Sequence, residues 1–354
     1  MEEEEEEEEY KEQCDSDYNV EQDEALGELN SQLVLHDSQP DADVLSVVPI
    51  EQNDKCVQKG NVQCQLSIKA VKKALKQLEK VKGWLDKVIA AGFGAFWNTN
   101  IGSSMNKNCM SFCMMKIDPV TMKITFGHDK VIEVNRYNIH KLTGLPNGEF
   151  TAPRPSIGGE NTAVNKLRAE LGIAKGEELT ISCLQKLLEK LVKDETDSPA
   201  PDPDREKIAL KVFFLIFFNK IICVGASARL KREPNMVDGL EFDQMKHMDY
   251  CQIVVDEIQR SAENWQSEKR TRWTYLEGFS LGPMLMYLDS LICGRNEDMS
   301  THTPRLDCLL EEKLEKIANA DCIVKDDIIE FGNIKVSTLS AFKCMNVDAF
   351  FVCI

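Results

Sequence analysis

The stretch Val131–Phe150, VIEVNRYNIHKLTGLPNGEF, decides the fold that this sequence predicts. A short apolar strand at its start runs into Asn135, whose side chain suits the N-cap of a helix because it accepts hydrogen bonds from backbone N–H groups. We expect a short helix over Arg136–Leu142 that is stopped by Gly144 and Pro146, since proline cannot continue a helix. The stretch contains no pattern typical of catalysis or ligand binding, so it predicts a structural module.

Three short strands are expected around this stretch. Cys109–Ile117 and Met122–Phe126 are apolar runs of strand length, and Asp118-Pro119 between them suits a tight turn. With Val131–Val134 as the third strand, the sequence predicts a small meander.

The residues Gly144–Gly148 are interpreted as a structural stop rather than a binding loop. Leu142 and Leu145 are expected to face inward. Gly148 is expected to supply a conformation with positive φ, which glycine adopts without a steric penalty.

Upstream, Leu66–Ala91 shows helical periodicity, with apolar residues on one broad face and lysines opposite. Gly92-Phe93-Gly94 follows and is expected to end the helix, because glycine commonly caps a helix C-terminus. Seven lysines between Lys69 and Lys87 could attract nucleic acid. No arginine or exposed aromatic residue accompanies them, so we interpret them as a solvated helix face.

Helices also dominate the sequence downstream. Ile208–Val224 is interrupted by polar residues and is shorter than the roughly 20 apolar residues that a membrane span needs, so it predicts a central buried helix and no membrane partner. Asp194–Arg205, rich in proline and aspartate, predicts an exposed linker. The other helices are expected at Ala163–Leu171, Thr180–Lys193 with Thr180 as N-cap, Met245–Asn264, Trp273–Ile292 and Leu306–Ala318, with weaker apolar runs at Ile323–Phe331 and Val347–Ile354.

The net charge of −17 is concentrated at one end of the chain. Residues 1–54 hold 20 Asp or Glu and one Lys, whereas residues 55–354 carry a net charge of +2. The acidic composition of residues 1–60 predicts a disordered tail. Such a tail serves either a basic partner or only solvation, and its composition favours solvation. A near-neutral body has no bulk attraction for nucleic acid or anionic membranes.

The cysteines and the N-terminal residues indicate the compartment. Thirteen cysteines in a chain rich in core residues are typical of small buried hydrophobes in a reducing environment. The N-terminal residues Glu2–Glu9 replace the apolar core of a secretory signal, so we expect the protein not to be secreted.

Four stretches in a fixed order carry a resemblance: Ile89–Phe96 (IAAGFGAF), Met115–Gly148 with MKIDPVTMKITF and IHKLTGLPNG, Phe213–Leu230 (FFLIFFNKIICVGASARL), and Asp249–Leu291 with DYCQIVVDEIQRSAENW and GFSLGPMLMYLDSL. Together they resemble the plant mobile domain, also called aminotransferase-like, a family found in plant transposons and in genes domesticated from them. The resemblance covers about residues 66–295. The family motifs fall on Gly92, Phe93, Gly94, Asp118, Pro119, Gly144, Leu145, Pro146, Gly148, Tyr287, Leu288 and Asp289, for which we expect structural roles.

The resemblance implies a transposon-derived protein located in the nucleus. Two departures from the family pattern stand out. A Cys-Pro-like step of the family is replaced here by Cys223-Val224-Gly225, and the residues from Glu297 onward match no part of it. Some relatives are fused to a protease for ubiquitin-like proteins, and this chain is expected to lack that part.

A catalytic cysteine needs a histidine and a third residue that orients it. Cys308 follows Asp307 and is near His302 in the sequence, and Cys322 also follows an aspartate. The triad of the related protease is spread over distant segments, so we interpret Cys308 as a packing residue on the Leu306–Ala318 helix. We predict no catalytic residues.

No metal or cofactor site is predicted. Cys109 and Cys113 lack a second ligand pair at zinc-finger spacing, and the histidines are scattered. Gly92 and Gly94 end a helix, whereas a phosphate-binding loop opens one. Despite the family's alternative name, no lysine stands in a recognisable Schiff-base context.

Two short basic patches, Ala228–Arg232 and Lys269–Arg272, could contact nucleic acid. We interpret Lys269–Arg272 as a surface turn whose flanking residues, Trp265 and Trp273, anchor the core.

The sequence therefore predicts a mainly α fold. Residues 61–295 form a helical domain with a small three-stranded β-meander (α+β), residues 1–60 form a disordered acidic tail, and residues 296–354 form an extension whose fold the sequence does not determine. The predicted function is a non-enzymatic, transposon-derived module that binds unknown protein partners in the nucleus. The alternatives are a truncated protease-linked protein acting as an adaptor and a DNA-associated transposon protein, against which the near-neutral body argues.

Overall fold

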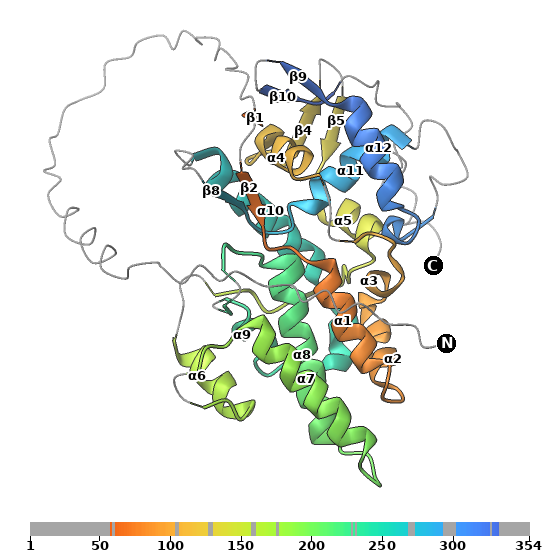
Figure 1. The fold of residues 1–354 in the computed structure, drawn as a ribbon, viewed down its shortest axis with the longest axis vertical. Coiled ribbons are helices and arrows are strands. Elements are labelled where there is room, and N and C mark those ends of the chain that lie inside the picture. The colour runs from red at the N-terminus through yellow and green to blue at the C-terminus, as the bar shows by residue number, and fades with distance from the viewer. Residues whose placement is uncertain are drawn as a thin grey trace, which may run out of the picture. The chain divides into compact units, whose positions relative to one another are not determined.

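The computed structural model (Figure 1) describes residues 57–332, apart from gaps at 59–60, 103–105, 127–129, 157–160, 175–176, 228, 231, 268–272, 293–301 and 326–327. The chain divides into two units, Met1–Glu51 and Gln52–Ile354, and every described element belongs to the second. The predicted disordered tail, apart from its last residues, and the apolar run Val347–Ile354 lie outside the described residues. None of the described helices combines the length and apolar character needed to cross a membrane.

The second unit is mainly helical, as the sequence predicts. Its longer helices are α1 (Ile68–Leu78), α4 (Lys107–Lys116), α5 (Arg136–Thr143), α6 (Asn161–Glu170), α7 (Ile181–Thr196), α8 (Pro203–Phe217), α10 (Tyr250–Ser267), α11 (Leu281–Ile292) and α12 (Glu311–Asp321). Its shorter helical segments are α2 (Trp84–Val88), η2 (Ile89–Phe93), α3 (Ala95–Asn98), η3 (Phe218–Ile222), α9 (Pro234–Val237), η4 (Phe242–His247) and η6 (Arg305–Asp307).

The strands are short and form small separate sheets. The predicted meander is the antiparallel sheet β3-β4-β5, made of β3 (Ile117–Asp118), β4 (Lys123–Phe126) and β5 (Lys130–Glu133). The other sheets are β1-β10-β9, made of β1 (Val57–Gln58), β10 (Ile328–Glu330) and β9 (Ile323–Lys325); β2-β8, made of β2 (Asn61–Cys64) and β8 (Trp273–Leu276); and β6-β7, made of β6 (Phe150–Thr151) and β7 (Met248–Asp249). The pairs β1-β10 and β2-β8 join the start of the described chain to its later part.

The core is built around α8, as the apolar run Ile208–Val224 predicts. Asp202 caps the helix and Pro203 opens it, a position where proline's missing N–H has no helical partner to lose. Both α1 and α7 pack on α8 and contact each other (Figure 1). Phe217 is fully buried, and its ring meets the edges of Phe93 and Phe96 at centroid distances of 5.0 and 4.9 Å.

The predicted caps and inward-facing residues of the Val131–Phe150 stretch are confirmed. Asn135 Oδ1 accepts the Asn138 N–H at 2.9 Å and begins α5. Leu142 and Leu145 are fully buried. At α7 the expected cap is also present, because Thr180 Oγ1 accepts the Cys183 N–H at 3.3 Å.

The prediction of a strand over Cys109–Ile117 is wrong, because most of this segment forms helix α4. Asn106 caps the helix by accepting the Cys109 N–H at 3.0 Å. Seven consecutive residues of α4, Cys109–Met115, are buried, and they occupy every face of the helix. An apolar run that is buried all round has no period, so a buried helix and a buried strand look alike in the sequence.

The prediction of one helix over Trp273–Ile292 is also wrong. Residues 273–276 form β8, which pairs in parallel with β2, a strand more than 200 residues earlier in the chain. Gly278, at φ +57°, then turns the chain into α11. A strand stabilised by so distant a partner leaves no local signal at this length.

Several boundaries differ from the predicted ones. The helix expected over Leu66–Ala91 divides into α1, α2 and η2, with Gly83 in the left-handed region at φ +88°. The exposed linker shrinks to residues 197–202, because α7 and α8 both extend into the expected Asp194–Arg205. The helix expected at Met245–Asn264 starts later, after η4 and β7, and ordered structure begins at β1, inside the expected tail.

The C-terminal segment belongs to the same unit as the helices before it. The helix expected over Leu306–Ala318 is the short turn η6 followed by α12, which packs on α11. The apolar run Ile323–Phe331 forms β9 and β10, and β10 pairs with β1.

Candidate functional site

The Gly-Leu-Pro motif begins with a helix stop and ends as a cap for α10. Gly144 adopts φ +69° at the C-terminus of α5. The Leu145 carbonyl accepts hydrogen bonds from His140 Nδ1 at 2.7 Å and from Cys251 Sγ at 3.2 Å. The Pro146 carbonyl accepts the backbone N–H groups of Tyr250 at 3.0 Å and Cys251 at 3.2 Å. The motif therefore satisfies N–H groups that the first turn of α10 leaves without a helical partner.

The Gly-Phe-Gly motif meets the same place from a distant part of the chain. Gly92 has φ +93°, and a Cβ built on it would lie 2.8 Å from Pro146 Cγ. Glycine is required there for both the backbone conformation and the close approach of proline. Phe93 is fully buried, and its ring meets the rings of Phe214 and Tyr250 edge-on at centroid distances of 5.0 and 5.4 Å.

Gly148 is required for a reason other than the predicted one. Its φ is not positive, so the expectation of a left-handed conformation is wrong. Instead, a Cβ at this position would overlap the backbone carbonyl of His247. The Gly148 N–H donates to the Met248 carbonyl at 3.1 Å, which holds the two chain segments at this separation.

The Asp-Pro motif is a turn docked on α10. Asp118 accepts hydrogen bonds from Thr121 Oγ1 at 2.7 Å and from the Val120 N–H at 2.9 Å, and these bonds lower the pKa of its carboxyl. Gln259 of α10 donates from Nε2 to the Pro119 carbonyl at 2.9 Å. The predicted tight turn is confirmed, and its contact with α10 is an additional finding.

The Tyr-Leu-Asp motif holds the C-terminal segment. Tyr287 stacks on Phe126 with a centroid distance of 4.3 Å, and its hydroxyl donates to Asp321 at the end of α12. Asp289 is fully buried and accepts from Arg305 Nη2 at 2.6 Å and from Arg305 Nε at 3.0 Å. We call the Tyr287–Asp321 and Asp289–Arg305 contacts together the C-terminal clamp. Removing one partner of the Asp289–Arg305 pair would take a buried ion pair from the other partner.

The candidate nucleophile Cys308 lies outside the helix that the sequence predicts for it. It follows η6, before α12 begins, rather than lying on the expected helix. Among the described residues, no hydrogen bond joins Cys308 Sγ to His302. Burial raises the pKa of Asp307, and the nearby His302 opposes that rise.

The pair Cys109 and Cys113 lies one helical turn apart on α4, inside the core. Burial raises the pKa of Cys109 well above its ordinary value, and the neighbouring Cys113 thiol raises it further. A protonated thiol is a poor metal ligand. Among the described residues, no group of three or more His, Cys, Asp or Glu side chains is placed to hold a metal ion.

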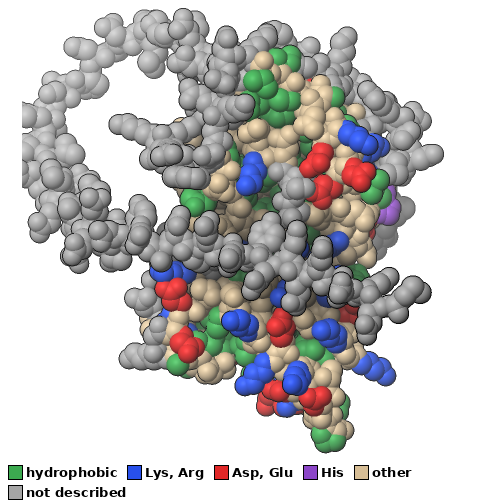
Figure 2. Space-filling model, in the orientation of Figure 1, with side chains coloured by type: hydrophobic (Ala, Val, Ile, Leu, Met, Phe, Trp, Pro, Cys, Tyr) green, Lys and Arg blue, Asp and Glu red, His purple; other side chains and the backbone are tan. Residues whose placement is uncertain are grey.

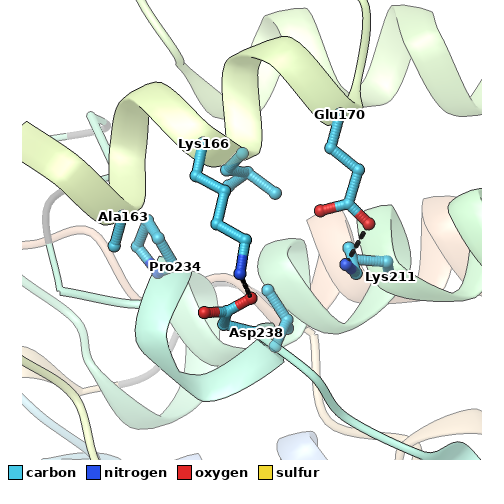
Figure 3. A pocket seen from close by; sticks show the side chains of 8 residues that line it. Ala163, Lys166, Glu170, Lys211, Pro234 and Asp238 are labelled. Carbon is cyan, nitrogen blue, oxygen red and sulfur yellow. Dashed lines mark hydrogen bonds and ion pairs between the residues drawn. The ribbon is translucent and has the colours of Figure 1, made fainter.

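A small hollow lies between α6, α8 and α9 in the described part of the chain (Figure 3). Its empty volume of about 180 Å³, part of it open to solvent, is below that of ordinary ligand sites. Lys166 reaches Asp238 at 2.6 Å, and Lys211, which is almost fully buried, pairs with Glu170 (Figure 3). Each charge is therefore paired across the hollow and is not directed at a ligand.

In the predicted basic patch Ala228–Arg232, both arginines are paired with glutamates. Arg232 donates from both Nη atoms to Glu257 at 2.7 Å, and Arg229 pairs with Glu178. The second patch, Lys269–Arg272, and the side chain of Trp273 lie outside the described residues, whereas Trp265 is buried as expected.

The Cys-Val-Gly step that departs from the resembled family lies in the core. Cys223 Sγ donates to Met236 Sδ at 3.5 Å, and burial raises the pKa of Cys223 well above its ordinary value. The Val224 carbonyl accepts the Gly278 N–H at 2.7 Å. This segment fastens the start of α11 to the end of the central helix.

One surface with exposed aromatic groups was not predicted from the sequence. Asp249, which begins α10, accepts from Arg136 Nη1 at 2.8 Å, and the Arg136 guanidinium lies 5.1 Å from the Tyr137 ring centroid. Phe150 is in β6, opposite Met248, the residue before Asp249. Two helical turns along α10, Asp256 pairs with Arg154 at 2.9 Å, and Val120 projects from the turn that Gln259 holds. We call this surface the α10 ledge, made of Val120, Arg136, Tyr137, Phe150, Arg154, Asp249 and Asp256.

Three side chains of the ledge are apolar and exposed, and ion pairs to α10 hold its base. The exposed fractions of Val120, Tyr137 and Phe150 are 88, 52 and 65%. Two arginine–aspartate pairs, Arg136–Asp249 and Arg154–Asp256, join α5 and the segment after β6 to α10 across more than 90 residues of sequence. The Pro119 turn is held separately by Gln259. Phe150 within a polar loop was the available signal, but no local pattern connects it to α10.

The comparisons concern the same part of the chain. A protein-family model, described as a domain of unknown function (DUF8566), matches residues 64–282. No curated protein and no solved structure matches the chain. The matched range runs from the end of β2 to the first residues of α11 and includes the Gly-Phe-Gly, Asp-Pro and Gly-Leu-Pro motifs. Since this match covers more than half of the sequence, the chain belongs to the family described as a domain of unknown function (DUF8566).

Proposed function

We propose that the protein is a non-enzymatic module that binds a protein partner through the α10 ledge. The observation that carries this proposal is the set of three exposed apolar side chains, Val120, Tyr137 and Phe150, on a base held by two arginine–aspartate pairs. Exposed aromatic residues beside arginine are the composition that protein interfaces favour.

The motif residues support the same proposal by their roles. The Gly-Leu-Pro, Asp-Pro and Tyr-Leu-Asp residues form caps, turns and buried pairs, and these position α10 and the segments beside it. A rigid scaffold lowers the ordering entropy that binding costs at its surface. The resemblance to the plant mobile domain adds that the module is transposon-derived and nuclear.

A pull-down from plant nuclear extract with the full chain tests the proposal. The ledge variant is Tyr137→Ala/Phe150→Ala, and the matched control is Tyr275→Ala/Leu310→Ala, which removes exposed apolar side chains from β8 and from the segment before α12. We expect the wild type and the control to retain a shared protein that the ledge variant loses. Equal unfolding midpoints for all three proteins establish that folding is not the cause. Equal capture by the ledge variant would contradict the proposal.

The non-enzymatic part is tested separately with an electrophilic ubiquitin-like probe. We expect no rapid labelling of Cys308, because no histidine is hydrogen-bonded to its sulfur in the described residues. Labelling of Cys308 that is abolished by His302→Ala would overturn this part and leave the ledge result unaffected.

A further inference from the structure

The exposed face of α1 carries a regular row of lysines. Lys69, Lys73, Lys76 and Lys80 are all exposed and are spaced four, three and four residues apart. This spacing places them in one stripe along α1 and the turn after it. The opposite side of the helix, including Ile68, Val71 and Leu75, is buried.

A second row of lysines lies beside the first. Lys186, Lys190 and Lys193 are exposed on α7 at the same kind of spacing. Both helices pack on α8 and contact each other, and Lys73 Nζ reaches Glu189 Oε1 of α7 at 3.2 Å. The two rows therefore share one solvent-facing surface, although they are more than 100 residues apart in the sequence. We call these seven lysines the lysine face.

The lysine face is positive within a body that is nearly neutral. Its seven lysines stand against four acidic side chains on α7 and at the C-cap of α1, those of Glu79, Glu189, Asp194 and Glu195, and Glu195 is paired with Arg205. Only Lys73 of the seven forms an ion pair with another described residue. Figure 2 shows Lys and Arg side chains gathered over the region of α1 and α7, with acidic side chains between them.

We propose that the lysine face docks an acidic peptide segment with an unbroken run of glutamate or aspartate. Lys69 and Lys80 are separated by about 16 Å along the helix axis. An extended peptide places its same-side carboxylates about 7 Å apart, so two or three of them fit over that length, and the α7 row receives those that point the other way. Residues Glu2–Glu9 of this chain provide an example of such a run.

The composition of the face favours carboxylates over nucleic acid phosphates. The sequences of α1 and α7 contain no arginine and no aromatic residue, so neither bidentate phosphate contacts nor base stacking is available there. This site is distinct from the α10 ledge, and the proposal does not rest on the function proposed for the ledge.

Fluorescence anisotropy with a labelled peptide of the sequence of residues 1–12 tests the proposal on the full chain. The face variant is Lys76→Glu/Lys190→Glu, which changes one lysine in each row. The control is Lys313→Glu/Lys316→Glu, which makes the same change of charge on exposed positions of α12. We expect the face variant to bind about fivefold more weakly or worse, and the control to match the wild type within about twofold. Binding is expected to weaken with added salt because exposed charges are screened over about 10 Å at 0.1 M.

Three outcomes would overturn the proposal. One is the absence of peptide binding at low salt. Another is an equal loss of affinity in the face variant and the control, which would indicate only bulk attraction. The third is tighter binding of a single-stranded DNA of equal charge, which would make the face a nucleic acid site. Circular dichroism of each variant checks that the helices are retained.

Discussion

The backbone of His247 leaves no room for a side chain at position 148. Gly148 is a glycine because two chain segments touch there, and Gly92 is one because of both a positive φ and the contact with Pro146. By contrast Gly172, at φ +68°, has no atom near its hypothetical Cβ. Gly148 therefore shows steric overlap alone, Gly172 shows backbone strain alone, and Gly92 shows both.

Gly148→Ala is expected to lower the free energy of unfolding by about 3 kcal/mol or more, because the backbone contact must open. The matched variant Gly172→Ala carries only the strain of the left-handed region, about 1–2 kcal/mol. Urea unfolding of both variants measures the difference. Equal losses would mean that the contact with His247 relaxes at little cost.

The reactivity of the Cys322 thiol gives a second prediction for a single residue. Burial raises the pKa of its thiol above the ordinary value of 9.0, and the Asp321 carboxylate raises it further. At pH 7.5 we therefore expect slower alkylation by iodoacetamide than for a free cysteine, with a rate that continues to increase above pH 9 as the thiolate forms. Peptide mass spectrometry follows the rate, and a plateau below pH 8 would contradict the assignment.

At the scale of the elements, α8 and the C-terminal clamp hold distant segments together by two different kinds of contact. The phenylalanines of α8 and η3 meet side chains from η2, α3 and α10, and the second half of α8, Ala209–Phe217, is buried on every side. The clamp joins α11 to the segment around η6 and α12 through buried polar groups. One element depends on apolar contact and the other on paired charge.

Phe217→Ala is expected to cost about 3–5 kcal/mol of unfolding free energy, because the ring is fully buried and the cavity is lined by other rings. Phe150→Ala removes the same side chain from an exposed site and is expected to change stability by about 0.5 kcal/mol or less. Chemical denaturation of the two variants provides the comparison. A cost below about 1 kcal/mol for Phe217→Ala would be incompatible with a core position.

Breaking the clamp at one side is expected to be costly. Arg305→Ala leaves the Asp289 carboxylate buried without its partner, for which about 3–5 kcal/mol is typical. Asp238→Ala, which removes the exposed partner of Lys166, serves as the control at about 0–1 kcal/mol. The double variant Asp289→Ala/Arg305→Ala should recover part of the loss, and strict additivity would show that the two groups do not interact.

At the scale of the whole molecule, residues 52–332 contain all the described contacts, including those of the C-terminal segment. The segment after residue 301 is joined to the body by the clamp and by the β1-β10 pair. The first and last described strands are therefore paired within one compact unit, and we expect this unit to unfold cooperatively.

A chain that begins at Gln52 is expected to unfold within about 2 °C of the full chain, because the deletion removes none of the described contacts. A chain that ends at residue 295 is the contrasting variant, since it lacks Arg305 and Asp321 and should lose most of its cooperativity. Differential scanning calorimetry distinguishes the two. A large drop on removing residues 1–51, or none on removing 296–354, would reverse the assignment.

The sequence by itself determined the parts of the fold that depend on neighbours in the chain. Asn135 and Thr180 identify helix starts, Gly144 and Pro146 identify a stop, and the apolar run Ile208–Val224 identifies the central helix. These signals work because caps, periodicity and proline act over one or two turns.

Only the tertiary structure decided the features that join distant segments. It made α4 a helix and β8 a strand, and it brought Asp289 to Arg305. It also placed the His247 backbone against Gly148, which explains why that residue is a glycine. It also assembled the α10 ledge and placed the α7 lysines beside those of α1. In each case the deciding partner is far along the chain, and the free energy of such contacts has no counterpart in local propensity.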